Sequence, residues 1–439
     1  MTTLTILSAS WSERPVTMRL PFQFGSTEVR ETAEAHARVE IEVNGTRVTG
    51  RSAQLMVPRW FNKSAEMSNA DTIDELRNVV DNAVAEAPGL RGTALEVTRA
   101  LRSGLDRALP STPPLARCFG PALVEMAVID AICTALQLPF WKAARDDVFG
   151  LVSGCPDDLS PTDLSGSLAA ISAPKALVLR HTVGFDAPLR RGDVGAEAPD
   201  DGRPVSLDEV IEDIGVSAFK IKLKGDPDAD HRRLRDIAGL LDMGGDYAVT
   251  LDANEQYAPG DFGAFLGALS KDATLTRFLS AVRFVEQPFP REIALTAPVE
   301  APLPLIIDES DDSEDAFARA LALGWSGTSI KSCKGVLRAL INKARAEGAG
   351  AILSGEDLTC QPGICWLQDA AMMSACGVRD VERNGHHFAG GMQGAPDEER
   401  AILLERHNDI LTQDDNGVAL RIAGGRVEIG SLARPGFGC

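Results

Sequence analysis

Phe219-Lys220-Ile221-Lys222-Leu223 opens the stretch, residues 219–334, around which the rest of the chain is organised. It is a short apolar run that carries two lysines. Three later apolar runs each lead directly into one carboxylate: residues 248–251 into Asp252, 282–285 into Glu286 and 305–307 into Asp308. Runs of this kind are typical of short buried strands, and the segments between them have helical length and composition. Strands that alternate with helices predict a parallel sheet.

Eight strand candidates follow residue 170. They are residues 176–183, 218–223, 247–252, 282–286, 305–308, 329–331, 351–354 and 378–381. Eight parallel strands are the number that a closed (β/α) barrel needs, and such a barrel carries its chemistry at the C-terminal ends of the strands. We therefore predict an α/β fold with a TIM-type barrel over residues 170–415.

The residues before the barrel predict a separate α+β domain over residues 1–150. Strand-like segments are Thr3–Ser10, Met18–Phe24, Arg38–Val43 and Thr46–Met56. Asn44-Gly45 between the last two is a strong hairpin signal. Helical spacing of apolar residues then predicts helices within residues 64–148, at about 73–83, 93–109 and 121–138.

The C-terminal tail, residues 416–439, contains two more strand-like segments, 418–422 and 425–429. They predict a hairpin. Because a hairpin does not easily extend a closed parallel barrel, we expect the tail to join the N-terminal domain. Residues 150–205 are less regular, and 184–205 predict a long polar loop.

Composition limits the classes of function. Hydrophobic residues make up 44% of the chain and charged residues 24%, which is ordinary for a soluble globular protein. The net charge of −19 argues against nucleic acid or an anionic membrane as a partner. No signal peptide or apolar stretch of about 18 residues is apparent. The eight scattered cysteines favour buried thiols in a reducing compartment, so a cytoplasmic location is expected.

Asp252, Glu286 and Asp308 predict a metal site. Carboxylates at three successive strand ends would crowd negative charge at the mouth of the barrel, and a divalent hard cation removes that penalty. Ligation by oxygen alone suits Mg²⁺, which keeps positions open for water or substrate oxygens. The alternative is three unrelated solvated carboxylates.

The lysines predict acid–base chemistry. Lys220 and Lys222 share one face of their strand because side chains alternate, and the apolar residues take the other face. Two adjacent buried ammonium groups lower each other's pKa toward that of a useful base. A surface strand rich in lysine is the alternative. Lys331 lies on the sixth strand and Lys222 on the second, so the two would face each other across the barrel.

Five motifs in this order resemble the enolase superfamily, and most closely its muconate-lactonizing subgroup. They are Phe219-Lys220-Ile221-Lys222, Leu251-Asp252-Ala253-Asn254, Val285-Glu286-Gln287-Pro288, Ile307-Asp308-Glu309-Ser310 and Ile330-Lys331. The resemblance implies an N-terminal α+β capping domain over a modified (β/α) barrel, and Mg²⁺ bound by Asp252, Glu286 and Asp308. It also implies removal of the proton α to the carboxylate of a small-molecule substrate, through an enediolate. Lys222 and Lys331 would be the acid–base pair, with Lys220 as an electrostatic helper.

Several features depart from the family pattern. The interval from Asp252 to Glu286 and the 184–205 loop are long, and Lys334-Gly335 stands where paired glycines are usual. At the eighth strand, dipeptide epimerases of the subgroup carry Asp-x-Asp, whereas this chain has Glu382-Arg383-Asn384. A dipeptide substrate is therefore not expected. These three residues are candidates for substrate contact, with a capping or surface role as the alternative.

Two residues next to the metal candidates have expected supporting roles. Asn254 shares the face of Asp252, and Glu309 is placed to pair with a lysine. The segment Ser354-Gly355-Glu356-Asp357 ends the seventh strand and is a candidate to line the pocket.

Three functions remain open at this point. The first is a racemase or epimerase that uses both lysines. The second is a lyase (dehydratase) or cycloisomerase that passes through the same intermediate with one lysine as base. The third is a catalytically silent relative. Because barrels of this size often associate, a homo-oligomer is expected.

Overall fold

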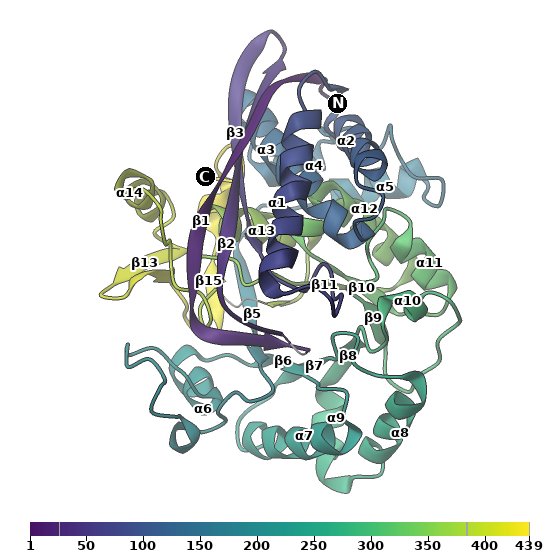
Figure 1. Ribbon diagram of the computed structural model, residues 1–439, viewed down its shortest axis with the longest axis vertical. Coiled ribbons are helices and arrows are strands. Elements are labelled where there is room, and N and C mark those ends of the chain that lie inside the picture. The colour runs from purple at the N-terminus through teal and green to yellow at the C-terminus, as the bar shows by residue number, and fades with distance from the viewer. Residues whose placement is uncertain (26, 383–384, 439) are drawn as a thin grey trace.

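An antiparallel sheet and its helices form one layer of the molecule, and this layer stands over a parallel barrel (Figure 1). The computed structural model describes residues 1–25, 27–382 and 385–438. The N-terminal sheet has the order β3-β2-β1-β4. Its strands are β1 (Leu4–Phe24), β2 (Thr27–Val43), β3 (Thr46–Met56) and β4 (Arg91–Gly92).

The predicted hairpin at Asn44-Gly45 is confirmed, because Val43 of β2 pairs directly with Thr46 of β3. Both turn residues have positive φ, as this turn requires. The prediction of two separate strands before residue 25 is wrong, since β1 is one strand of 21 residues. Its middle, residues 8–15, has no buried side chain and so lacks the apolar alternation that marks a strand, yet it stays paired with β2.

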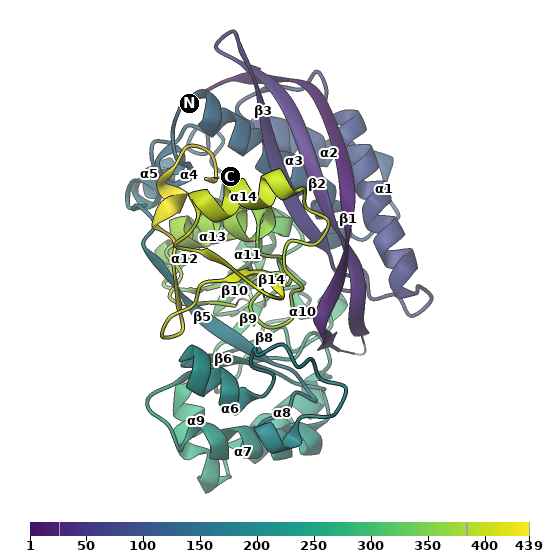
Figure 2. The ribbon, with the colours of Figure 1, turned by 90° about the vertical axis from the view of Figure 1, so that its left-hand side faces the viewer.

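Helices cover one side of this sheet (Figure 2). They are α1 (Asn69–Glu86), α2 (Ala94–Ala108) and α3 (Pro114–Ala135), and α4 (Phe140–Arg145) follows and packs against α3. Ser68 and Thr93 cap α1 and α2, each through a reciprocal capping box. α3 begins seven residues earlier than predicted (114 against 121), and Pro121 lies inside it. It is apolar and long enough to cross a membrane by length and composition, but 89% of its most apolar window is buried inside the protein.

The barrel contains the eight parallel strands that the sequence predicts. They are β5 (Ala176–Val183), β6 (Ala218–Lys222), β7 (Ala248–Asp252), β8 (Val282–Glu286), β9 (Leu305–Ile307), β10 (Gly327–Ile330), β11 (Ile352–Gly355) and β12 (Val381–Glu382). β12 pairs with β5 and closes the barrel. The predicted fold class, a modified TIM barrel beneath an N-terminal α+β cap, is confirmed.

Helices surround the barrel and follow it toward the C-terminus. They are α5 (Pro161–Ala169), α6 (Leu207–Glu209), α7 (Pro227–Leu241), α8 (Pro259–Leu269), α9 (Thr276–Ala281), α10 (Arg291–Ala294), α11 (Ala316–Ala322), α12 (Val336–Ala349), α13 (Ile364–Cys376) and α14 (Asp397–Arg406). Short 3₁₀ or π turns occupy 191–193, 210–214, 273–275, 332–334 and 430–433.

The tail does not form the predicted hairpin. Its strands are β13 (Leu411–Asp414), β14 (Gly417–Leu420) and β15 (Arg426–Glu428). β14 pairs with β13, and β15 pairs antiparallel with residues 176–178 of β5. β5 begins before the register of its neighbour β6, which pairs only with 180–183, so its first residues offer an edge that β15 fills. Beyond β15, Gly436 bridges to Pro139, and Phe437 stacks on Phe140 with 4.7 Å between ring centroids.

Candidate active site

The three carboxylates predicted to bind metal lie side by side at the mouth of the barrel. Asp252 ends β7 and Glu286 ends β8, and the two occupy paired positions of neighbouring strands. Asp308 directly follows β9. All three are buried, with at most 1% of each residue exposed. Parallel strands bring their carboxyl ends to one edge, which is why residues far apart in the sequence meet here.

Lys220 of β6 lies at the centre of the buried charge. Its Nζ is 2.6 Å from Oε2 of Glu356, 2.8 Å from Oε2 of Glu382, 2.9 Å from Oε2 of Glu286 and 3.0 Å from Oδ2 of Asp252. The lysine therefore neutralises part of a cluster of four carboxylates. This contact set is consistent with the electrostatic role expected for Lys220.

Lys222 and Lys331 approach the cluster from different strands. Nζ of Lys222, at the end of β6, lies 2.5 Å from Oδ2 of Asp252 and 2.9 Å from Oδ1 of Asn254. Nζ of Lys331, just after β10, lies 2.7 Å from Oδ1 of Asp308 and 2.8 Å from Oε2 of Glu356. β6 is the second barrel strand and β10 the sixth, so the two lysines belong to opposite walls.

The electrostatics differ from the expectation of a lowered lysine pKa. Burial by itself lowers the pKa of Lys220, but the surrounding carboxylates, led by Asp252, raise it well above the ordinary value. Lys331 behaves in the same way, because Asp308 and Glu356 outweigh its burial. The prediction that neighbouring ammonium groups dominate is thus wrong for Lys220, since carboxylates outnumber lysines around it.

Glu286 is only partly compensated, because Lys220, its ion-pair partner at 2.9 Å, is shared with three other carboxylates. Both of its carboxylate oxygens are buried, and among the described residues neither accepts a hydrogen bond. Burial and the charges of Asp252 and Glu356 raise the pKa of Glu286 well above its usual range. Such a carboxylate requires a cation or a proton.

The oxygens present fit a hard divalent cation. Glu286, Asp308 and Glu356 each offer one oxygen, and these three oxygens lie within 4.8 Å of one another. Mg²⁺ prefers oxygen ligands of this type. Asp252 is not part of this close group, and its oxygens contact Lys222, Lys220 and the backbone N–H of Asn254. Asp252, Glu286 and Asp308 remain the predicted set, and Glu356 joins them as a candidate.

Sequence reasoning gave Glu356 only a place in the pocket lining and Lys334 no role. Glu356 follows β11 just as Asp308 follows β9, so its position at a strand end was the available signal. Nζ of Lys334 donates to the backbone carbonyl of Asp308 at 2.7 Å and lies 3.0 Å from its Oδ1. It lies three residues after Lys331, and nothing in the local pattern indicates that its side chain turns toward Asp308.

Aromatic residues from the N-terminal domain cover the mouth. Phe22 and Phe24 of β1, with Val57 and Trp60, line a cavity of about 20 Å³ that also contacts Lys222 and Lys331. Nζ of Lys331 lies 5.2 Å from the centroid of the Trp60 ring, the geometry of a cation–π contact. A cavity of this size has room for about one water molecule, so a substrate requires the cover to move.

Three solved structures share this architecture across nearly their whole length. They are an enolase from Bradyrhizobium complexed with magnesium and mandelic acid (17% identity, TM-score 0.63, 100% of this chain and 96% of that one), the L-Ala-D/L-Glu epimerase from Bacillus subtilis (16%, 0.62, 99% and 98%) and 2-chloromuconate cycloisomerase from Rhodococcus opacus (15%, 0.61, 99% and 96%). The chain shares their fold, a modified (β/α) barrel beneath an N-terminal cap. No family model and no curated protein matches the sequence.

Of the three candidates for substrate contact at the eighth strand, the structure describes only Glu382. Glu382, at the end of β12, is buried and already engaged, because its Oε2 accepts from Lys220 and its Oε1 accepts from Thr182. Its predicted contact with substrate thus competes with internal partners. Arg383 and Asn384 lie outside the described residues, and their roles stay predictions.

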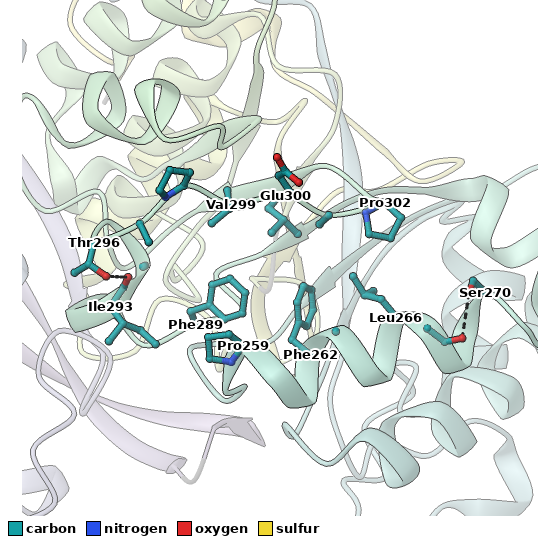
Figure 3. Close-up of a pocket in the computed structure, with 17 residues that line it drawn as sticks. Pro259, Phe262, Leu266, Ser270, Phe289, Ile293, Thr296, Val299, Glu300 and Pro302 are labelled. Carbon is teal, nitrogen blue, oxygen red and sulfur yellow. Dashed lines mark hydrogen bonds between the residues drawn. The ribbon is translucent and has the colours of Figure 1, made fainter.

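A cavity larger than the one at Lys222 and Lys331 lies away from the mouth of the barrel. It has a volume of about 540 Å³ and lies between α8 and residues 293–302 (Figure 3). Phe262, Leu266, Phe289 and Val299 line it, and Glu300 is its one carboxylate among the lining residues. It contains no cluster of acid–base groups, so the smaller cavity at the lysines is the candidate active site.

Proposed function

We propose that this chain is an enolase-superfamily enzyme that removes the proton α to the carboxylate of a small molecule, and that it racemises or epimerises its substrate. The observation that carries the proposal is the placement of Lys222 and Lys331. They arise from the second and sixth strands of a closed barrel, and both contact one cavity. A substrate between them presents one face to each ammonium or amine.

The reaction follows from these two positions. One lysine takes the α-proton from its face, which leaves an enediolate, and the other lysine delivers a proton to the opposite face. Reversal exchanges the two roles, so the configuration at the α-carbon is inverted. When bound by carboxylates such as Glu286, Asp308 and Asp252 or Glu356, Mg²⁺ would supply positive charge for the substrate carboxylate. The cover of aromatic side chains excludes water from the site.

Proton exchange in D₂O tests the proposal. Purified protein with Mg²⁺ is incubated with N-acyl amino acids, dipeptides and hydroxy acids, and deuterium at the α-carbon is followed by NMR. We expect one substrate class to exchange from both enantiomers. Lys222→Ala should abolish exchange from one enantiomer, and Lys331→Ala from the other. Lys224→Ala, which changes an exposed lysine two residues from Lys222, should leave both rates within about twofold.

The lyase or cycloisomerase alternative gives a different outcome. Such an enzyme consumes the substrate and needs only one lysine as base. If substrate disappears into a new product and one lysine variant alone is inactive, this alternative replaces racemisation. If no member of any class exchanges or reacts, the proposed activity on these compounds is rejected.

A further inference from the structure

A chain of contacts runs from the N-terminal domain to Lys222. It begins at Lys63 in the cap loop, residues 57–68, which connects β3 to α1. Nζ of Lys63 lies 2.9 Å from Oε1 of Glu309, and the same Oε1 accepts from Nδ2 of Asn254 at 3.2 Å. The other end of that amide, Oδ1 of Asn254, accepts from Nζ of Lys222 at 2.9 Å.

The orientation of the Asn254 side-chain amide is fixed by its partners in this series of contacts. Its NH₂ group donates to Glu309 and its oxygen accepts from Lys222, and a reversed amide would face the ammonium with another donor. Lys63 holds the same residue a second time, because its Nζ donates to the backbone carbonyl of Asn254 at 2.9 Å. Asn254 adopts a left-handed backbone conformation (φ 42°), which fixes where its side chain begins.

Lys63 is the ion-pair partner of Glu309. The Glu309 side chain is fully buried, and within the described part of the chain Lys63 is the one cation in an ion pair with it. Glu255, the other carboxylate at Lys63, keeps a bidentate partner in Arg291 when Lys63 is removed. Loss of Lys63 therefore acts mainly on Glu309.

Arg291 anchors the same loop by an independent route. Its guanidinium donates to the carbonyls of Phe61 and Trp60 and pairs with Glu255. No contact joins it to Lys222 or to the amide of Asn254 within the described residues. Lys63 and Arg291 thus both hold the cap loop down, but of the two only Lys63 belongs to the hydrogen-bonded chain that ends at Lys222.

We propose that Lys63 is a positioning residue for Lys222: when the cap loop docks, Lys63 sets Glu309, Glu309 orients the amide of Asn254, and Asn254 holds the ammonium of Lys222. Docking of the cap loop is thereby coupled to Lys222 through hydrogen bonds, whereas Lys331 meets the same loop only through the ring of Trp60. The inference rests on the proposed two-base reaction and adds to it an asymmetry between the two faces of the substrate.

The test compares the two enantiomers. Lys63→Met should slow α-proton exchange from the enantiomer that depends on Lys222 by roughly tenfold more than exchange from the enantiomer that depends on Lys331. The loss should fall on kcat, because Lys222 is assigned to proton transfer and not to substrate binding. Lys63→Arg, which keeps the charge, should remove most of the difference between the two enantiomers. Arg291→Met is the control: it loosens the same loop but removes no contact to Glu309, to the amide of Asn254 or to Lys222, so it should not slow the Lys222-dependent enantiomer more than the other.

A Lys63→Met variant that slows both enantiomers equally would overturn the inference and leave a simple loop anchor. A crystal structure of the same variant provides a readout that needs no substrate. In it, the Asn254 amide should reverse or withdraw, and the contact between Lys222 and Asn254 should be lost. If Asn254 stays in place, the inference is wrong even where exchange cannot be measured. Absence of exchange in the unmodified protein, by contrast, counts against the proposed function alone.

Discussion

At the scale of single residues, Glu356 connects two of the lysines. Its Oε2 lies 2.6 Å from Nζ of Lys220 and 2.8 Å from Nζ of Lys331, while its Oε1 accepts from Ser354 and lies 3.2 Å from Arg180. Burial opposes its ionisation, but Lys220 and Lys331 lower the pKa of Glu356 well below its ordinary value. It therefore stays charged at the point where Glu286 and Asp308 offer their oxygens.

Replacing this carboxylate distinguishes two sets of metal ligands. If Glu356 is a ligand, Glu356→Gln should weaken Mg²⁺ or Mn²⁺ binding by at least roughly tenfold, as measured by calorimetry or by Mn²⁺ electron paramagnetic resonance. Asp252→Asn is the companion variant for the set predicted from sequence. Glu300→Gln changes an exposed carboxylate and serves as control. If Glu356→Gln binds the metal ion with unchanged affinity, Glu356 is not a metal ligand and serves only as an ion-pair partner of Lys220 and Lys331.

Sequence reasoning at this scale worked best where a residue ends a buried strand. Asp252, Glu286 and Asp308 could be brought together from spacing alone, because parallel strands align their ends. Lys334 and Lys63 could not, since one follows the strand end within a turn and the other comes from a loop of the other domain. Their roles depend on the direction of a long side chain, and rotamers do not follow from sequence periodicity.

At the scale of secondary-structure elements, the turn that carries Lys331 and Lys334 is held from the N-terminal domain. It leads directly into α12, and Oε1 of Glu125 in α3 accepts from the backbone N–H groups of Val336 and Leu337 at the first turn of that helix. A carboxylate at a helix N-terminus satisfies free N–H groups and complements the helix dipole. One side chain thus joins α3 to the helix that follows the sixth barrel strand.

Removal of this contact should destabilise the fold. Glu125→Ala leaves two buried N–H groups without their acceptor, so we expect a loss of about 2–3 kcal/mol in the free energy of unfolding, measured by urea titration. Glu125→Gln retains an acceptor oxygen and should lose less than half of that amount. Equal losses in the two variants would indicate that packing around α3, and not the hydrogen bonds, holds the junction.

Secondary-structure elements with a local apolar pattern could be predicted from the sequence, and elements held by pairing with distant residues could not. The number of barrel strands was predicted correctly because most of them are apolar runs between helices, but the eighth, predicted at 378–381, is Val381–Glu382 and shares only Val381 with the prediction. The single long β1 was missed because its middle is held by backbone pairing without buried side chains. β15 was assigned the wrong partner because a strand's partner depends on which edge is open in the finished sheet. The amino-acid sequence of the tail does not indicate which edge of the barrel sheet is open.

At the scale of the whole molecule, Asp130 joins the tail to the N-terminal domain. Its carboxylate accepts from the backbone N–H of Arg51 in β3 and from that of Phe437 near the C-terminus. Burial outweighs these hydrogen bonds and raises the pKa of Asp130 from 3.8 to about 6. The folded protein therefore keeps a proton between about pH 4 and pH 6 that the unfolded chain has released.

This difference has a defined sign. Because the folded state binds the extra proton, the contribution of Asp130 favours folding at low pH and is lost as the pH rises through about 6, by about 3 kcal/mol in total. Asp130→Asn cannot titrate. Its free energy of unfolding relative to the unmodified protein should thus increase by about this amount from pH 4 to pH 7, as measured by urea titration at each pH. A constant difference across that range would show that Asp130 is ionised in the folded protein throughout.

The tail also determines when the chain can finish folding during synthesis. Phe437 reaches Asp130 across 307 positions of sequence, and it stacks on Phe140 in the first domain. A ribosome releases residues from the N-terminus onward, so the first domain emerges with one side uncovered while the whole barrel is still being made. Its partners in the tail follow the barrel in the sequence and are therefore made after it. The cap that covers the lysines consequently reaches its final packing only after the barrel beneath it exists, and contacts of such long sequence separation make that last step slow.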